Sequence, residues 1–204
     1  MSKKRESIKT TIQEAIDYWV KFVDECDLSV DWSEADTHCW RCGCEKHLQR
    51  CHIIPDSLGG KDCPENIVLL CERCHAEGPN VTDPEVMWDW IKAYKVPFYE
   101  TFWSIRGMKE YEFIYKKKVS EELLYILTQI GIEKNSEEFQ EEWKFCMNSV
   151  RDEASIHFGQ PYFNTVTVAG IYRMMLKRLA AEHNVDFPVK NENEIPKTPW
   201  WCNV

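Results

Sequence analysis

Hydrophobic residues recur at helical spacing near the start of the chain. Between residues 7 and 23, isoleucine, tryptophan and valine return every three or four positions, which predicts an amphipathic helix. The segment Asp83-Pro84-Glu85 predicts the start of another helix, because it supplies an N-cap, a proline at the first helical position and an acid in the first turn. Pro97 ends or redirects this helix. Residues 98–115 are rich in aromatic side chains, and their pattern is ambiguous.

From residue 120 onward the pattern is helical. Ser120 is a candidate N-cap for a helix that ends at Gly131. Asn135, with a glutamate three residues later, fits a capping box for the next helix. A last helix is predicted over about residues 166–182, and the tail at 184–204, rich in proline and asparagine, is expected to be irregular.

Residues 37–80 break the helical period and hold most of the cysteines. The chain has ten cysteines, and seven of them lie within the 36 residues from Cys39 to Cys74. A secreted disulfide scaffold spreads its cysteines more evenly and usually carries an export signal. The N-terminus is charged and no apolar stretch follows it, so we see no signal peptide. We therefore expect a cytoplasmic protein whose cysteines bind metal.

Charge and hydropathy exclude several classes of protein. The formal net charge is -9, which argues against a broad basic surface for nucleic acid but leaves room for a local one. No apolar run reaches the roughly 18 residues of a membrane-spanning helix, so no membrane partner is expected. With 204 residues the chain can bury a core without disulfides.

Two Cys-x-x-Cys turns, separated by 28 residues, carry the strongest chemical signal. Each turn brings two thiolates onto one ion, and two turns complete the tetrahedral four-sulfur site of structural zinc. Cys44 competes with Cys42, because Cys-x-Cys can also chelate, and His38 or His47 could replace a thiolate. Buried free thiols are the alternative without metal. The preferred ligands are Cys39, Cys42, Cys71 and Cys74.

Between and after these turns the chain holds further residues of a recognisable pattern. They are Arg50-Cys51-His52-Ile53-Ile54-Pro55, Gly59-Gly60, Asn66 and His75. In this order, the stretch 39–79 resembles the HNH endonuclease family, whose core is a ββα-metal or His-Me finger. The resemblance covers about a fifth of the chain. It implies an α+β, mostly helical fold class, with a small zinc-stapled ββα-metal finger embedded among α-helices.

The resemblance also implies roles for three residues. His52 would be the general base that activates water, a task that suits a neutral imidazole near pH 7. His75 would bind a catalytic divalent ion (Mg²⁺, Mn²⁺ or a softer ion) that stabilises the leaving 3′ oxygen. Asn66 would tie the loop so that His52 stays aimed. Cleavage by this family implies 5′-phosphate and 3′-hydroxyl ends.

One position departs from the family pattern. Where the family usually has an acid or a histidine before the base, this chain has Cys51. A thiolate is a poor ligand for magnesium and a better one for zinc or another soft metal. Either Cys51 is a bystander, or the preferred metal is unusual. Water or a nearby carboxylate could complete the shell, and the candidates are Asp56, Asp62 and Glu65.

Five basic residues are candidates for contact with DNA: Arg41, Lys46, Arg50, Lys61 and Arg73. Nearby acids keep the finger close to neutral, so its affinity for DNA would need other segments or a partner. One active site cuts one strand, and the helical region could therefore form a homodimer or bind a protein partner. For Trp88, Trp90 and Trp103, helical spacing favours the core over base stacking.

We therefore predict a metal-dependent endonuclease that hydrolyses DNA phosphodiester bonds. One alternative is a zinc-held DNA- or protein-binding module without catalysis. Another is a protein-interaction scaffold with an inactivated core, which would not bind DNA even at low salt. The predicted segments are an N-terminal helical segment (1–36), the HNH zinc core (37–80), an aromatic-rich helical extension (81–118) and a C-terminal helical region with an irregular tail (119–204).

Overall fold

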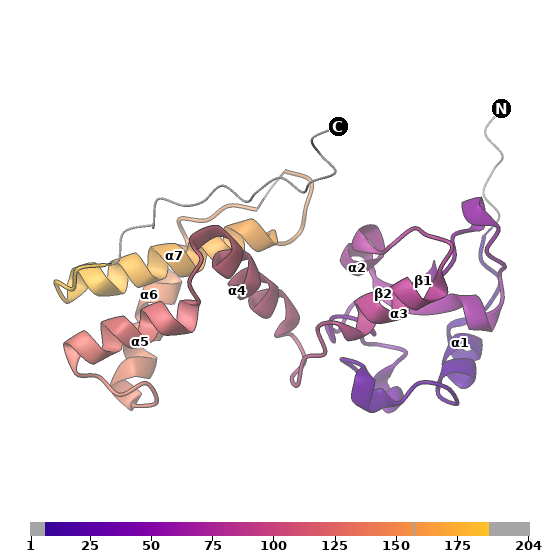
Figure 1. The fold of residues 1–204 in the computed structure, drawn as a ribbon, viewed down its shortest axis with the longest axis horizontal. Coiled ribbons are helices and arrows are strands. Elements are labelled where there is room, and N and C mark those ends of the chain that lie inside the picture. Colours follow the sequence, from indigo (N-terminus) through magenta and orange to yellow (C-terminus); the bar gives the residue numbers. More distant parts are fainter. Residues whose placement is uncertain (1–6, 157, 188–204) are drawn as a thin grey trace. The chain divides into compact units, whose positions relative to one another are not determined.

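The structure is a computed structural model that describes residues 7–156 and 158–187 (Figure 1). The chain divides into two compact units, residues 1–103 and residues 104–204. The finer division into four segments stays a prediction. No helix in the described part of the chain is long and apolar enough to span a membrane.

A two-stranded antiparallel sheet and the helix after it form the centre of the first unit. Strand β1 spans Leu48–His52 and β2 spans Ile67–Cys71. They pair in a register that places His52 opposite Ile67. Helix α2 (Glu72–Glu77) begins directly after β2. This ββα order among many helices confirms the predicted fold class, an α+β protein that is mostly helical.

Strand β2 is the most deeply buried element of the first unit. All five of its residues are buried, and a strand buried on both faces has a continuous apolar run instead of alternation. Helix α1 (Ile12–Trp19) packs against β2 and the turn before it. The Trp19 indole N–H donates a hydrogen bond of 2.8 Å to the carbonyl of Ile67, which anchors α1 to the start of the strand.

Helix α1 is shorter than the predicted span of residues 7–23, which was wrong at both ends. The Thr11 hydroxyl accepts a hydrogen bond from Glu14 N, and the Glu14 carboxylate accepts one from Thr11 N. This capping box fixes the start of the helix. After Trp19 the backbone tightens, with Lys21 N donating to Tyr18 O, and the helix ends. Residues 7–10 are consequently not helical.

Tryptophan rings fill the space beside the sheet. Trp40 is fully buried, and its indole N–H donates 3.0 Å to Ala35 O. The Trp88 ring lies 4.5 Å from Trp19 and 6.5 Å from Trp40, centre to centre. Trp88 comes from helix α3 (Pro84–Lys92), so the core packing predicted for this residue is confirmed.

Helix α3 begins as the sequence predicts. The Asp83 carboxylate accepts a hydrogen bond of 3.0 Å from Glu85 N, with Pro84 in the first helical position. The shorter turns of this unit are 3-10 helices, η1 (Glu25–Asp27), η2 (Trp32–Glu34), η3 (Asp56–Leu58) and η4 (Pro64–Asn66).

The second unit is helical. Helix α7 packs against α5 and α6, and their buried side chains include Ile126, Leu127, Met175 and Leu176. Most of the predicted irregular tail lies outside the described residues. The helices are α4 (Phe102–Tyr115, whose first two residues belong to the first unit), α5 (Val119–Ile130), α6 (Glu137–Arg151) and α7 (Thr165–Glu182).

Two predicted helix starts in this unit were wrong by one or two residues. Ser120 lies inside α5, because the Glu121 carboxylate instead accepts the backbone N–H of the residue before the helix. Helix α6 is capped by Ser136 and not by Asn135, since the Ser136 hydroxyl accepts a hydrogen bond of 3.1 Å from the third residue of the helix. The predicted end of α5 is confirmed, with Gly131 at φ 75°.

A buried ion pair joins α5 to α7. Arg173 Nη1 lies 3.1 Å from Glu122 Oε1, and the two side chains are 13% and 3% exposed. The Tyr111 hydroxyl donates to the same carboxylate. Burial, followed by this hydrogen bond, raises the pKa of Tyr111. The carboxylate depends on both partners, because removing one partner of a buried pair leaves an uncompensated charge.

We expect Arg173→Met to lower the free energy of unfolding by about 3–5 kcal/mol, because Glu122 is then a buried charge without its cation. Urea unfolding followed by circular dichroism measures the loss. Adding Glu122→Gln to the same chain removes the charge and should recover most of the stability. A loss below about 1 kcal/mol in the single variant would contradict the importance of the pair.

Candidate active site

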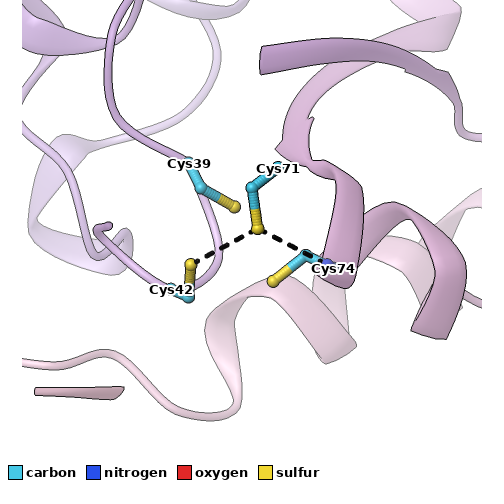
Figure 2. A group of neighbouring side chains, drawn as sticks. All are labelled: Cys39, Cys42, Cys71 and Cys74. Atoms are coloured by element: carbon cyan, nitrogen blue, oxygen red, sulfur yellow. Dashed lines mark hydrogen bonds between the residues drawn. The ribbon is translucent and has the colours of Figure 1, made fainter. Parts of the chain in front are cut away.

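Four cysteine side chains converge from two parts of the first unit (Figure 2). Cys39 and Cys42 come from the loop before β1, Cys71 ends β2, and Cys74 lies in α2. Their sulfur atoms all lie within 4.8 Å of one another, and all four residues are buried. Cys42 Sγ and Cys71 Sγ are 3.8 Å apart. Zinc–sulfur bonds of about 2.3 Å in a tetrahedron separate sulfur atoms by roughly 3.8 Å, so the cluster could hold a metal ion.

The structure decides between the ligand sets that the sequence left open. Cys44 is buried outside the cluster, and its Sγ lies 3.7 Å from Cys42 O. The His38 ring stacks on Tyr99, with the ring centres 4.3 Å apart. His47 is exposed. None of these three alternative ligands belongs to the group of converging side chains.

Gly43 shapes the first Cys-x-x-Cys turn. Its φ is +62°, a conformation that favours glycine, and a Cβ there would lie 2.5 Å from Ser29 O. Gly43 N donates 2.8 Å to Cys39 O and closes the turn. The residue after the second cysteine of the turn therefore has to be glycine for both thiols to face the cluster.

Arg41, predicted to contact DNA, is instead fully buried beside the cluster. Its Nη1 lies 3.5 Å from Cys74 Sγ and 3.5 Å from Glu77 Oε2. Its guanidinium stacks over Trp90, 3.9 Å from the ring centre, and over Phe102 at 4.6 Å. A guanidinium is always charged and stacks on aromatic faces. Arg41 therefore places a positive charge next to the sulfur atoms.

Arg73, also predicted to contact DNA, is likewise buried against an aromatic ring. It is 8% exposed, and its guanidinium lies over the Trp103 ring. Trp90 and Trp103 consequently serve as stacking partners for buried arginines. The other three residues predicted to contact DNA lie nearer the surface. Lys46 and Lys61 are exposed, and Arg50 lines the groove that also contains His52 and His75.

His52 and His75 line one open groove with a volume of about 920 Å³. His52 stands at the end of β1 and His75 lies in α2. The two histidines line the same groove because α2 packs against both strands. The groove is lined by Ser7, Ile8, Lys9, Arg50, Cys51, His52, Pro55, Asp56, Asp62, His75, Gly78, Pro79 and Asn80.

Asn66 fixes the loop that follows His52. Its side-chain oxygen accepts a hydrogen bond of 2.9 Å from Ile54 N, and its Nδ2 donates to Ile54 O (3.0 Å) and Lys61 O (2.9 Å). The side chain is buried, at 8% exposure. Gly60 completes the loop, because a Cβ there would lie 1.7 Å from Ile54 O. The geometry suits the positioning role implied by the family resemblance.

His75 Nδ1 lies 2.7 Å from Oε1 of Gln49, a residue of β1 that the sequence did not single out. An amide oxygen only accepts hydrogen bonds, so Nδ1 carries a proton, and in the neutral imidazole Nε2 then carries the lone pair. This is the tautomer that can bind a metal through Nε2. Gln49 lies two positions before Cys51, on the same face of the strand. This spacing of two along the strand was the signal in the sequence that could have identified Gln49 as a site residue.

Cys51 is buried, at 5% exposure, and its Sγ lies 3.6 Å from His52 O. Burial, followed by the negative charge of Cys39, raises the pKa of the Cys51 thiol to about 12. A thiol binds metal as the thiolate, so an ion at Cys51 would have to displace this proton. Within residues 7–156 and 158–187, no group of three ligand atoms converges on His75. An ion at His75 would therefore need ligands from a substrate or from water.

Asp62 and Arg50 hold the segment before α1 along the groove. The Asp62 carboxylate accepts from Lys9 N (2.6 Å) and Thr10 N (3.1 Å), and Arg50 Nη1 donates 2.9 Å to Thr10 O. The backbone hydrogen bond from Lys9 is the main reason why the pKa of Asp62 lies below its ordinary value, and the nearby His52 also lowers it. The sequence offered Asp62 only as a possible metal ligand.

The comparisons with known proteins give one match. Residues 37–89 match the family described as HNH endonuclease. The match spans the cysteine cluster, both groove histidines and the start of α3. No curated protein and no solved structure shows a significant match.

We expect Arg41→Met to weaken zinc binding by the cluster about 10- to 100-fold, because the cation that donates to Cys74 is lost. Methionine retains much of the side-chain length between Trp90 and Phe102. Competition with a chromophoric chelator measures the affinity, and Arg151→Met, an exposed change in α6, is the control. Equal affinities in the two variants would show that Arg41 has only a packing role.

Proposed function

We propose, from the match of residues 37–89 to the HNH endonuclease family, that the protein is a metal-dependent endonuclease that hydrolyses DNA phosphodiester bonds. The observation that carries the proposal is the position of His52 and His75 on one groove. The four-cysteine cluster would hold structural zinc and keep the finger folded. A homodimer or a protein partner through the helical region stays a prediction.

His52 would be the general base. It takes a proton from water as the water attacks phosphorus, and a neutral imidazole is suited to this near pH 7. The charge of His52 is one of the causes that hold the pKa of Asp62 below its ordinary value. Asn66 would keep the ring aimed through its three hydrogen bonds to the loop.

His75 would hold a divalent ion through Nε2, with Gln49 as a positioning residue that keeps the proton on Nδ1. The ion supplies positive charge for the phosphate and the leaving 3′ oxygen. Because no group of three ligand atoms in the described residues includes His75, the DNA itself would contribute to the ion's shell. Arg50 and Lys9, which also line the groove, would bind flanking phosphates.

A zinc-held binding module without catalysis is the second candidate. Two observations favour it: Cys51 is buried at the position where the family usually has a metal ligand, and no three-ligand group includes His75 among the described residues. Such a module would bind DNA in a salt-dependent way and leave it intact in every metal. Cleavage therefore discriminates between the two candidates.

We expect His52→Ala to lower the rate of plasmid nicking on the order of 100- to 10,000-fold, because the general base is lost. Supercoiled plasmid is incubated with protein in Mg²⁺, Mn²⁺, Ni²⁺, Zn²⁺ or EDTA. His47→Ala is the matched control, since His47 is an exposed histidine of the same finger outside the groove. Equal rates for both variants, with zinc content unchanged, would remove His52 from the reaction.

We expect Gln49→Leu to raise the metal concentration needed for half-maximal nicking about 10- to 100-fold, because the tautomer of His75 is no longer fixed. The rate at saturating metal should change much less. Gln49→Glu keeps an acceptor oxygen and should stay close to the wild-type requirement. A loss of rate at saturating metal with an unchanged metal requirement would contradict the positioning role.

A further inference from the structure

A second cluster of metal-ligating side chains lies in the helical unit, away from the finger in sequence. Glu142 and Cys146 stand one turn apart on α6, at spacing i and i+4. Glu182 is the last residue of α7, and His183 follows it as the C-cap. The cluster therefore joins the middle of one helix to the end of another that packs against it.

The distances within this cluster fit a small cation. Ligand atoms of Glu142, Cys146 and Glu182 all lie within 4.8 Å of one another. Cys146 Sγ is 3.8 Å from Glu182 Oε2, and His183 Nε2 is 3.4 Å from Glu142 Oε1. Zinc bonds of about 2.0–2.3 Å in a tetrahedron separate the ligand atoms by roughly 3.3–3.8 Å. The finger's cluster shows the same spacing between Cys42 and Cys71.

The ring nitrogen of His183 is a second and independent observation. Nε2 is buried from solvent and makes no hydrogen bond of acceptable geometry, although it faces the Glu142 carboxylate. Buried polar atoms in native proteins nearly always have a partner. An ion between the imidazole and the carboxylate would satisfy both groups.

The neighbouring cation does not neutralise the cluster by direct contact. Arg178 Nη1 donates 2.6 Å to Ser149 Oγ, and its Nη2 pairs at 2.6 Å with Glu153 Oε1. Cys146 is 1% exposed, and burial, followed by the charges of Glu182 and Glu142, raises the pKa of its thiol to about 11. The ligand atoms of two carboxylates and a buried thiol thus lie within 4.8 Å of one another.

We propose that Glu142, Cys146, Glu182 and His183 form a second metal site, which takes a zinc-class divalent ion and links α6 to the end of α7. A thiolate, an imidazole and two carboxylates are a mixed set that suits zinc or a similar ion and does not suit magnesium. Binding releases the thiol proton of Cys146 to solvent, and a sulfur–metal bond replaces the S–H contact with Glu182. Glu142, Cys146 and Glu182 supply the three ligand atoms that converge in the structure. His183, whose Nε2 lies 3.4 Å from Glu142 Oε1, would move toward the ion to supply the fourth.

Elemental analysis of the full chain tests the site. Protein equilibrated in buffered zinc and freed of excess metal should carry one more ion per chain than Cys146→Ser. Cys26→Ser, a change at an exposed cysteine outside both clusters, is the control and should match the wild type. The comparison holds whatever the four-cysteine cluster contains, because all three proteins keep it. Equal zinc content in wild type and Cys146→Ser would overturn the proposal.

Glu182→Gln is a second variant that leaves the buried thiol in place. It should bind the additional ion at least about tenfold more weakly in chelator competition, since it loses one charged ligand. Zinc should also raise the melting temperature of the wild type more than that of Glu182→Gln. Unchanged affinity and an unchanged response to zinc would overturn the proposal even if Cys146→Ser fails to fold.

Discussion

The convergence of four thiols is the constraint on which the finger depends. Cys71 is at once the last residue of β2, the N-cap of α2 and a member of the cluster, and its Sγ lies 3.5 Å from Cys74 N. The cluster therefore fixes where the strand stops and the helix begins. Helix α2 carries His75, and β1, paired with β2, carries His52 and Gln49. Losing the cluster would release both walls of the groove together.

The basic residues of the first unit lie in two environments, the buried surroundings of the cysteine cluster and the open groove. Arg41 and Arg73 lie inside, where Arg41 faces the sulfur atoms and aromatic rings cover both guanidinium groups. A four-thiolate site carries a net negative charge even with a divalent ion, and a buried cation offsets it. Arg50 and Lys9 line the groove, where they can meet an anion. Two cations thus line this groove although the net charge of the chain is -9.

The sequence predicted the parts of this site that depend on spacing along the chain. Paired Cys-x-x-Cys turns, the histidine before the loop and the asparagine that closes it are all local patterns. The contact of Gln49 with His75 and the burial of Arg41 depend on how strand, helix and aromatic rings pack, which residue order does not encode directly. The helix starts were predicted wrongly for a related reason. Thr11 and Ser136 have neighbours whose side chains are equally suitable N-caps, so the sequence alone does not select between them.

In the proposed reaction, the groove of His52 and His75 would hydrolyse a phosphodiester with the 3′ oxygen as leaving group. The chemistry of the cut ends tests this reaction. Nicked plasmid made by the wild-type protein is offered to a DNA ligase without prior treatment. We expect the nicks to reseal, because they would carry 5′-phosphate and 3′-hydroxyl ends. Nicks that reseal only after removal of a 3′-phosphate, or plasmid left intact in every metal, would contradict it.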